Sequence, residues 1–421
     1  MSAENLSQLA KTLIGSEIVS LGAEIKEKIK QGDKIYNFTV GDFDSSVFPI
    51  PTELENEIIN AYKNHYTTYP PADGILELRE AVAKFICERE GINYFPNEIL
   101  IAAGGRPLIY AAFRAIVDKG DKVIYPVPSW NNNHYVHFTE AEHVMVETRL
   151  ENNFMPTAAE IKPYLKDATL LALCSPLNPT GTTFTKQELS AICEMVIAEN
   201  EQRGADEKKL YLLYDQIYWT LTFGDTEHYN PVSLNPQMKA YTIFIDGISK
   251  AFAATGVRVG WSLGPAHVIN KMKAINSHVG AWAPMAEQKA LANYLGQTEN
   301  VNNYTKKFKG DIEERLRRIY SGFTQLKKEG FSVDAVAPQA AIYLTIQINL
   351  VGKKTADGKI LEKQNDVTAY ILNEAKIAIV PFYAFGAPKS SNWYRLSVGT
   401  CKIDEIDGML EQLKNALSGL S

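Results

Sequence analysis

The sequence predicts an α/β fold, with a large domain built on a mostly parallel central sheet and a small α+β domain formed by both ends of the chain. Short runs rich in β-branched residues alternate with longer segments of helical period, which is typical of an α/β protein. Several of these runs are continuously apolar, as expected for strands that helices cover on both faces. The chain has 421 residues, more than one small core requires, so we expect two domains.

Mainly apolar runs are predicted to form the strands. They are Ile99–Ala103, Lys122–Tyr125, His143–Glu147, Thr169–Cys174, Leu210–Tyr214, Tyr241–Ile245 and Val257–Leu263. The segment Ile75–Glu90 has apolar residues on one face and is followed by Gly91, which predicts a helix and its end. Thr185 and Glu188 have the spacing of a capping box, so another helix is predicted to begin there.

The predicted small domain combines residues 1–50 with residues 310–421, and the predicted large domain covers 51–309. Near residue 310 a charged helical segment gives way to a new strand pattern, SVDAVAPQAAIYLTIQI. No internal repeat, low-complexity tract or Gly/Ser linker separates the two parts. We therefore expect a small domain that encloses the large one in sequence.

Composition excludes several functional classes. The net charge of -6 gives no overall attraction to nucleic acid or to anionic membranes. We expect no signal peptide and no membrane span, because no long apolar run is present. The four cysteines are scattered without a CxxC pair, which argues against a disulfide framework or a zinc site and favours a reducing compartment, the cytoplasm.

Polar residues follow the predicted strands at the edge where open α/β sheets bind ligands. A glycine-rich turn, an indole, an amide, a carboxylate, a phenol, an amine and a guanidinium are all expected there. The residues are Gly105 and Arg106, Trp130, Asn178, Asp215, Tyr218, Lys250 and Arg258. This set fits a flat, anionic aromatic aldehyde that contains a ring nitrogen.

Each group has a chemical reason to bind such a molecule. The amine of Lys250 can condense with an aldehyde, and the carboxylate of Asp215 can keep a pyridine nitrogen protonated, so that the ring accepts electrons. Tyr218 and Asn178 can share a ring oxygen, and the indole of Trp130 can stack on the ring face. The glycine-rich helix start and Arg258 can bind a phosphate.

Four sequence blocks point to a known family. SPLNPTGT, YDQIYW, SKAFAATGVRVGW and WYRLSVG occur in that order, with 37, 35 and 8 residues separating Asn178, Asp215, Lys250 and Arg258. Over nearly its whole length the chain resembles the class I/II aminotransferases, which are pyridoxal-phosphate enzymes of fold type I. Within that family it looks most similar to aspartate and broad-range aminotransferases.

The resemblance implies a role for each cofactor residue. Lys250 corresponds to the lysine that forms a Schiff base with pyridoxal 5'-phosphate and then moves protons. Asp215 resembles the partner of the pyridine nitrogen, Tyr218 and Asn178 the ligands of the ring oxygen, and Trp130 the stacking aromatic. The phosphate ligands by the same resemblance are Gly105, Arg106 and Arg258.

The resemblance also implies substrate contacts and a dimer. Arg395 is similar to the arginine that binds the substrate α-carboxylate, with Gly41 as a backbone partner and with Trp130 and Asn178 beside the substrate. Tyr69 corresponds to a tyrosine that reaches the phosphate of the neighbouring subunit, which implies a homodimer with shared active sites.

Two departures from the family pattern affect these assignments. Many members have a hydroxyl residue three positions before the lysine, where this chain has Gly247, so one phosphate contact is expected to be missing or moved to Ser249. The common GEPDF-like motif is GDFDS here, which affects the surroundings of Gly41.

The predicted function is transfer of an amino group from an L-amino acid, with aspartate favoured, to a 2-oxo acid, with 2-oxoglutarate favoured, in a ping-pong cycle. Carbon–sulfur lysis, decarboxylation and alanine or aromatic amino-acid transfer use the same lysine and acid, although Arg395 favours reactions that keep the α-carboxylate. The sequence GISKA approaches a serine-hydrolase elbow but has alanine in its fifth position. A ligand-sensing regulator would need a DNA-binding module, and the chain has no basic face for one.

Overall fold

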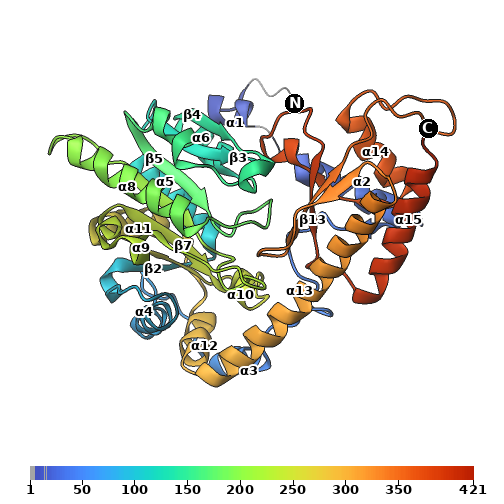
Figure 1. The fold of residues 1–421 in the computed structure, drawn as a ribbon. Coiled ribbons are helices and arrows are strands. Elements are labelled where there is room, and N and C mark those ends of the chain that lie inside the picture. Colours follow the sequence, from blue (N-terminus) through green and yellow to red (C-terminus); the bar gives the residue numbers. More distant parts are fainter. Residues whose placement is uncertain (1–4, 14, 16) are drawn as a thin grey trace.

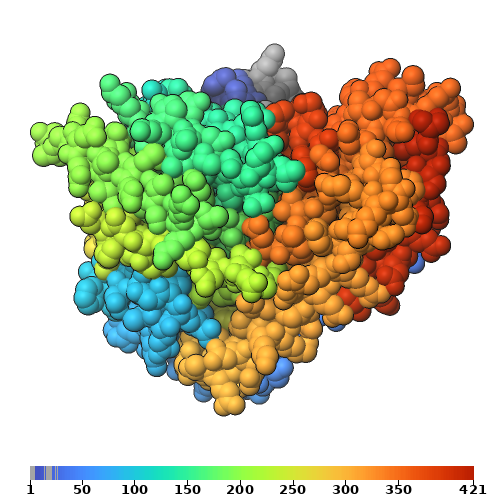
Figure 2. Space-filling model, in the orientation of Figure 1, coloured from blue at the N-terminus to red at the C-terminus, as the bar shows by residue number. Residues whose placement is uncertain are grey.

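The computed structural model describes residues 5–13, 15 and 17–421, so residues 1–4, 14 and 16 of the predicted small-domain segment lie outside the described residues. Figure 1 shows the central part of the chain, green to yellow, beside the C-terminal part, orange to red. The long helix α13 (Thr298–Lys328) runs from one to the other. Figure 2 shows these two parts meeting along a continuous boundary on this face of the molecule.

The central sheet has seven strands in the order β2-β8-β7-β6-β5-β3-β4. Their bounds are β2 Ile99–Ala102, β3 Lys122–Val127, β4 Glu142–Glu147, β5 Ala168–Cys174, β6 Tyr211–Asp215, β7 Thr242–Gly247 and β8 Gly260–Leu263. The pairs from β4 through β3, β5 and β6 to β7 are parallel, and β8 is antiparallel to both of its neighbours. The prediction of a mostly parallel sheet is therefore confirmed.

In most of the central strands, alternate residues pack against different helices. In β5, Leu171 and Leu173 join the core formed with helices α4, α8 and α12, whereas Leu170 and Ala172 join the core formed with α5, α6 and α11. These helices are α4 Leu76–Glu90, α5 Gly105–Ile116, α6 Asn132–Thr139, α8 Lys186–Gln202, α11 Ala266–Val279 and α12 Met285–Leu295. Burial on both faces explains why the strand sequences are continuously apolar.

A second core lies beside the central sheet. It packs around an antiparallel sheet of order β12-β13-β10-β9, and a parallel pair joins β1 to β11. The strands are β1 Tyr36–Asn37, β9 Val333–Ala335, β10 Tyr343–Ile348, β11 Ile377–Ala378, β12 Val380–Pro381 and β13 Trp393–Ser397. The β1–β11 pair places the early part of the chain against its late part.

The buried residues of α13 change core between Val301, which packs with the central sheet, and Phe308, which packs in the second core. The division into 1–50 with 310–421 and 51–309 stays a prediction. The other helices are α1 Gln8–Thr12, α2 Glu17–Lys30, α3 Thr52–Lys63, α7 Ala158–Ile161, α9 Pro231–Leu234, α10 Ile248–Ala251, α14 Gln364–Glu374 and α15 Ile406–Ser418. Among the described helices, none is both long and apolar enough to cross a membrane.

Local predictions from sequence are mostly confirmed, with two corrections. Helix α4 ends at Gly91, which adopts the left-handed conformation that suits glycine. The strand predicted from Val257 begins only at Gly260, because Arg258 has a φ of 63° that no strand residue adopts. The predicted capping box is also incomplete: the Thr185 hydroxyl accepts the backbone N–H of Glu188, but the Glu188 carboxylate accepts the N–H of Ala158 instead.

Candidate active site

The carboxyl ends of β5, β6 and β7 bring the predicted chemical groups together. Asp215 is the last residue of β6 and pairs with Cys174, the last residue of β5. Lys250 lies in the short helix α10 that follows β7 directly. Parallel strands end at the same edge of a sheet, so this arrangement confirms the geometric reasoning used on the sequence, while the role of each residue stays a prediction.

Lys250 is the buried amine of the site. Its Nζ donates a hydrogen bond to the carbonyl oxygen of Gly41 at 2.6 Å, and only 9% of the residue is exposed. Burial lowers the pKa of Lys250 to about 8, and this effect outweighs the nearby carboxylate of Asp42, which raises it. The positive charges of three arginines lower the pKa of Lys250 further: Arg395, Arg106 and Arg258. A neutral, nucleophilic amine is therefore accessible close to neutral pH.

Asp215 is a carboxylate held in an environment of low polarity. Burial raises the pKa of Asp215 to about 6, and the backbone N–H of Ile217, which donates to its Oδ1 at 3.1 Å, opposes that shift. A buried carboxylate with a raised pKa is stabilised by a cation placed beside it. A protonated ring nitrogen would supply that cation.

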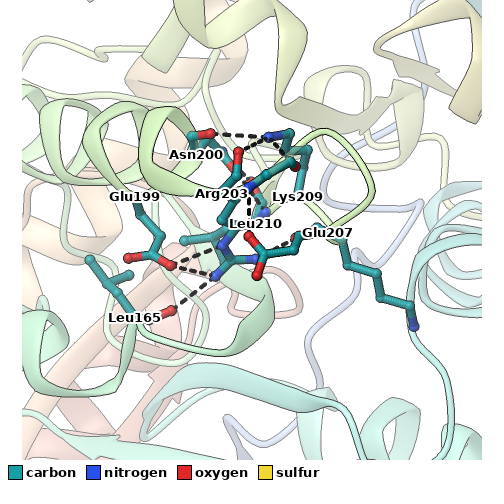
Figure 3. Close-up of polar contacts among 9 residues, drawn as sticks. Leu165, Glu199, Asn200, Arg203, Glu207, Lys209 and Leu210 are labelled. Carbon is teal, nitrogen blue, oxygen red and sulfur yellow. Dashed lines mark hydrogen bonds and ion pairs between the residues drawn. The ribbon is translucent and has the colours of Figure 1, made fainter.

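The strand that carries Asp215 is fixed at its start by the end of α8, as Figure 3 shows. The buried side chain of Asn200 donates to the carbonyl of Leu210 and accepts its N–H, both at 2.8 Å. Arg203 pairs with Glu199 at 2.9 Å and also donates to the carbonyl of Leu165. These contacts set the position of β6 and hence of the carboxylate at its other end.

Arg395 is a buried guanidinium in the middle of β13. Its Nη1 donates to Oδ1 of Asn178 at 3.0 Å, and its Nη2 donates to the carbonyl of Thr39 at 2.6 Å. Its buried Nε has no hydrogen-bond partner among the described residues, and burial lowers the pKa of the group. A cation with neutral partners and an unused donor is suited to bind an anion that enters from outside.

Gly41 lies directly over this guanidinium. A Cβ at this position would lie 3.6 Å from Nη1 of Arg395 and 2.9 Å from the hydroxyl of Tyr343. The predicted proximity of Gly41 and Arg395 is therefore present in the structure. The carboxylate of Asp42, from the unusual GDFDS motif, accepts hydrogen bonds from the hydroxyl of Thr255 at 2.6 Å and the N–H of Phe43 at 2.8 Å.

The phosphate end of the predicted site lies at the start of α5. Helix α5 begins at Gly105, and its N-cap residue Gly104 has a φ of 88° and no side chain to accept the free N–H groups. A Cβ at Gly104 would lie 2.3 Å from Nη2 of Arg258, so only glycine leaves room for that guanidinium. Arg258 donates to the carbonyls of Ala103 and Thr255 at 2.6 and 2.7 Å. The free helix N-terminus and the guanidinium together form an anion-binding position.

Trp130 and Arg106, two of the predicted site residues, lie next to each other. The half-buried ring of Trp130 contacts Phe385, with ring centroids 6.2 Å apart. The exposed guanidinium of Arg106 lies 5.5 Å from the centre of the Trp130 ring. The predicted phosphate role of Arg106 therefore rests on its backbone N–H, because its side chain lies over the indole.

The structure explains why residue 247 is a glycine. A Cβ at Gly247 would lie 2.7 Å from Cα of Gly260 and 2.9 Å from the carbonyl oxygen of Val259. A hydroxyl residue cannot fit here unless the backbone of β8 moves. Ser249 is half-buried in α10 beside Lys250, and its contact with a phosphate stays a prediction.

Tyr69 is separate from this buried set. The residue is 84% exposed, and its ring meets the edge of Trp282 with centroids 5.2 Å apart. Its role, as predicted, depends on a second chain.

Sequence reasoning missed two contributors, Thr39 and Tyr343. The carbonyl of Thr39 fixes Arg395, and the hydroxyl of Tyr343 contacts that of Tyr218 at 2.6 Å. Neither residue follows a strand of the central sheet, so the rule that located the others does not apply to them. The only sequence signal for Tyr343 is its place within the predicted strand pattern SVDAVAPQAAIYLTIQI.

These residues fit pyridoxal phosphate. The site offers an amine with a lowered pKa at Lys250, a carboxylate suited to a cation at Asp215, and an anion position at Gly105 and Arg258. Arg395, the predicted ligand of a substrate carboxylate, has a buried Nε without a hydrogen-bond partner among the described residues. The part of the chain that the structure describes contains no group of acidic, histidine or cysteine side chains that could hold a metal ion.

Comparisons with known proteins agree with this chemistry. A family model described as aminotransferase class I and II matches residues 33–413. The aspartate aminotransferase of Bacillus sp. (strain YM-2) is 30% identical over 413 residues, which are 97% of this chain and 98% of the relative. The crystal structure of the aspartate aminotransferase from Rhizobium meliloti superposes with a TM-score of 0.89 at 26% identity, covering 99% of this chain and 100% of that one. The Thermus thermophilus aspartate aminotransferase with maleate gives a TM-score of 0.87 at 27% identity, covering 98% and 100%.

Proposed function

The chain belongs to the class I and II aminotransferases, which depend on pyridoxal phosphate, and from this premise we propose that it transfers the amino group of aspartate to 2-oxoglutarate. The observation that carries the amino-acid specificity is Arg395, a buried guanidinium bonded only to neutral groups among the described residues. Its two bonds use two of its five N–H groups, and its Nε has no partner among those residues. Such a group recognises an α-carboxylate by a planar pair of hydrogen bonds. The preference for aspartate is supported by the names of the relatives and by a second cation, Arg106, which is close enough to Lys250 to lower its pKa.

The residues of the chain divide the work of the reaction. When bound, pyridoxal phosphate supplies an aldehyde that exchanges with the substrate amine and a ring that accepts electrons from Cα. Lys250 is the group that accepts the Cα proton and returns it, because its lowered pKa makes the neutral amine available. Asp215 holds a positive charge at the ring nitrogen.

Arg395 keeps the substrate carboxylate fixed while the proton moves. A carboxylate held by a guanidinium is retained in the product, which favours transamination over decarboxylation. Trp130 provides a stacking surface, and Asn178, which accepts a hydrogen bond from Arg395, provides an amide as a hydrogen-bond partner. The carbonyl of Gly41 accepts a hydrogen bond from the amine of Lys250 and orients it.

The active unit under this proposal is a homodimer in the cytoplasm, with Tyr69 reaching the phosphate site of its neighbour. The dimer is supported by the large exposed ring of Tyr69 and by the exposed aromatic residue Tyr66 on the same segment. The cytoplasm is supported by four cysteines that are all free thiols.

A complementation experiment tests the shared site. Chains with Lys250→Ala and chains with Tyr69→Phe are mixed, so that each hybrid dimer has one site with both changes and one with neither. Activity above that of both impaired parents supports the shared site. An active monomer, or hybrids that gain nothing over an impaired Tyr69→Phe parent, would assign Tyr69 to its own subunit.

The substrate is tested by single half-reactions. Aspartate, alanine, phenylalanine and cysteine are each added without an acceptor, and the loss of cofactor absorbance and the product are followed. Aspartate should react fastest and give oxaloacetate in an amount equal to the sites. If the fastest reaction is the release of pyruvate and sulfide from cysteine, the result would instead support carbon–sulfur lysis. If alanine or phenylalanine reacts faster than aspartate, that amino acid would replace aspartate as the proposed donor.

Arg106 is the residue to vary in the same assay. Arg106→Gln should lower kcat/KM for aspartate by about tenfold, since a charge-assisted hydrogen bond contributes about 1.5–3 kcal/mol, while alanine is affected less. Arg114→Gln is the matched control, because Arg114 is an exposed arginine on the same helix that donates to the carbonyl of Phe138. If kcat/KM falls equally for aspartate and alanine, Arg106 does not recognise the side chain of the substrate.

A further inference from the structure

Tyr343 connects two parts of the site that are described separately above. It begins β10, is almost fully buried, and places its hydroxyl 2.6 Å from the hydroxyl of Tyr218. The two rings meet edge to face with centroids 5.5 Å apart. The guanidinium of Arg395 lies over the Tyr343 ring, 4.7 Å from its centre. The side chain of Tyr343 therefore contacts both Tyr218, which is predicted to bind the ring oxygen of the cofactor, and Arg395, which is predicted to bind the substrate carboxylate.

If Tyr218 donates a hydrogen bond to the cofactor, it is fixed which of the two phenols donates to the other. A phenol has a single proton, so a Tyr218 that donates to a ring oxygen can only accept from its other neighbour. Tyr343 must then be the donor. A hydroxyl that accepts one hydrogen bond becomes a stronger donor in the next, since chains of hydrogen bonds polarise one another.

We propose that Tyr343 is a positioning residue of the transamination site, which donates to Tyr218 through its hydroxyl and supports Arg395 through the face of its ring. This inference rests on the proposed function and deepens it. The hydroxyl strengthens the hydrogen bond from Tyr218 to the cofactor, and the ring keeps the guanidinium in the plane needed for the substrate carboxylate.

The surroundings of the pair favour this reading over simple packing. Gly41 closes over the Tyr343 hydroxyl, where a Cβ would lie at 2.9 Å, so the hydroxyl is held toward Tyr218. The charged or titratable groups that influence the pair are Arg395 from β13, Cys174 from β5 and Asp42 from the segment after β1. Burial raises the pKa of both phenols, so both stay protonated at neutral pH and each can donate.

The first test separates the hydroxyl from the ring. Tyr343→Phe removes only the hydroxyl, and the pH midpoint of the visible absorbance of the bound cofactor is measured. A weaker hydrogen bond from Tyr218 leaves more negative charge on the ring oxygen, so the midpoint should rise by about 0.2–0.6 pH units. In a Tyr218→Phe background, the same change should produce no further shift.

Tyr394→Phe is the matched control, because Tyr394 is a fully buried tyrosine of the neighbouring strand whose hydroxyl bonds to Gln364 and Thr368 instead. It should lose stability to a similar degree, measured by thermal unfolding, with no change in the midpoint. An unchanged midpoint in Tyr343→Phe, or a shift that persists without the Tyr218 hydroxyl, would overturn the role of the hydroxyl.

The second test concerns the ring and does not use turnover. Binding of succinate, a dicarboxylate that cannot donate an amino group, is followed through the cofactor spectrum. Tyr343→Phe keeps the ring and should bind within about twofold of the unchanged protein, whereas Tyr343→Leu should bind about three- to tenfold more weakly, as loss of a buried cation–π contact predicts. Equal affinity of the two variants would overturn the support of Arg395.

Failure of the inference can be told apart from failure of the proposed function. If the unchanged protein transfers amino groups and only the Tyr343 variants show no effect, the positioning role is wrong. If the unchanged protein gives no half-reaction with any amino acid, the proposed function itself is wrong.

Discussion

The amine of Lys250 donates a hydrogen bond to the carbonyl oxygen of Gly41 at 2.6 Å, across 209 positions of sequence. This contact joins the residue that follows the central strand β7 to the early segment that follows β1. The same segment supplies the carbonyl of Thr39 to Arg395. The amine of Lys250 and the guanidinium of Arg395, the predicted ligand of the substrate carboxylate, are therefore both oriented by backbone carbonyls of one short segment.

The buried amine predicts an unusual pH dependence for cofactor loading. The pKa of Lys250 is lowered to about 8, so the rate at which pyridoxal phosphate attaches to the cofactor-free protein should rise between pH 7 and 9 with a midpoint near 8. An ordinary lysine amine would give a midpoint near 10.4. Stopped-flow absorbance at a series of pH values measures this, and a rate that still rises steeply above pH 9.5 would contradict the burial argument.

The carboxylate of Asp215 predicts a link between pH and stability in the cofactor-free protein. Its pKa in the folded chain is about 6, above the usual 3.8, so the folded state holds the proton more tightly than the unfolded state. Its stabilising contribution is complete below about pH 4 and is lost as the pH rises through 6, by up to about 3 kcal/mol.

Urea unfolding of the cofactor-free protein and of Asp215→Asn, at pH values from 4 to 8, isolates this carboxylate. The unchanged protein should lose stability relative to the variant as the pH rises from 4 to 6, and bound cofactor should reverse the loss by supplying a cation. In the loaded enzyme, Asp215→Asn should slow proton removal by orders of magnitude while the covalent link to Lys250 still forms. A stability difference that does not vary with pH would be inconsistent with this account.

Replacing Arg395 by lysine keeps the charge and removes the planar pair of donors. Arg395→Lys should lower kcat/KM for the amino acid by at least about tenfold, because a charge-assisted hydrogen bond contributes about 1.5–3 kcal/mol. The absorbance of the bound cofactor should not change. The matched control is Arg315→Lys, since Arg315 also donates to backbone carbonyls, those of Cys401 and Asp311, but lies on α13. A changed spectrum with unchanged kinetics would place Arg395 outside the substrate site.

The contact between α8 and β6 predicts a purely structural effect. Asn200→Ala leaves the buried N–H and carbonyl of Leu210 without their partners, which should lower the free energy of unfolding by about 2–4 kcal/mol. Gln202→Ala, an exposed change on the same helix end, should alter stability by less than about 0.5 kcal/mol. Chemical denaturation compares the two variants, and equal stability would show that the Asn200 bridge does not hold β6.

The sequence was sufficient to predict where the polar groups that follow the parallel strands lie. Asn178, Asp215 and Lys250 could be located because strands buried on both faces are recognisable and their carboxyl ends share one edge. The mostly parallel sheet is confirmed for the same reason. The aminotransferase family, which four sequence blocks indicated, is confirmed by the family model that matches residues 33–413. The start of β8 was predicted three residues too early. Val257 and Val259 are β-branched and favour a strand, but the left-handed backbone of Arg258 prevents one before Gly260.

Other contacts could not be predicted for physical reasons. The acceptors for Lys250 and Arg258, and one of the two acceptors for Arg395, are backbone carbonyls. Every residue has a backbone carbonyl, so the side-chain pattern does not reveal which ones are used. Tyr343 meets Tyr218 within the second core but across 125 positions of sequence, and no rule of spacing connects them. Such contacts depend on how segments that are distant in the sequence pack together in the folded chain.

The central claim, that Lys250 carries the cofactor and moves the proton, is tested most directly by reduction with borohydride followed by peptide mass analysis. We predict a single modified peptide, with the mass of reduced pyridoxal phosphate on Lys250, and loss of the visible absorbance. In parallel, Lys250→Ala should bind the cofactor without a covalent link and lose at least about 10²–10⁴-fold in turnover. Modification of a different lysine, or substantial turnover by Lys250→Ala, would contradict the account.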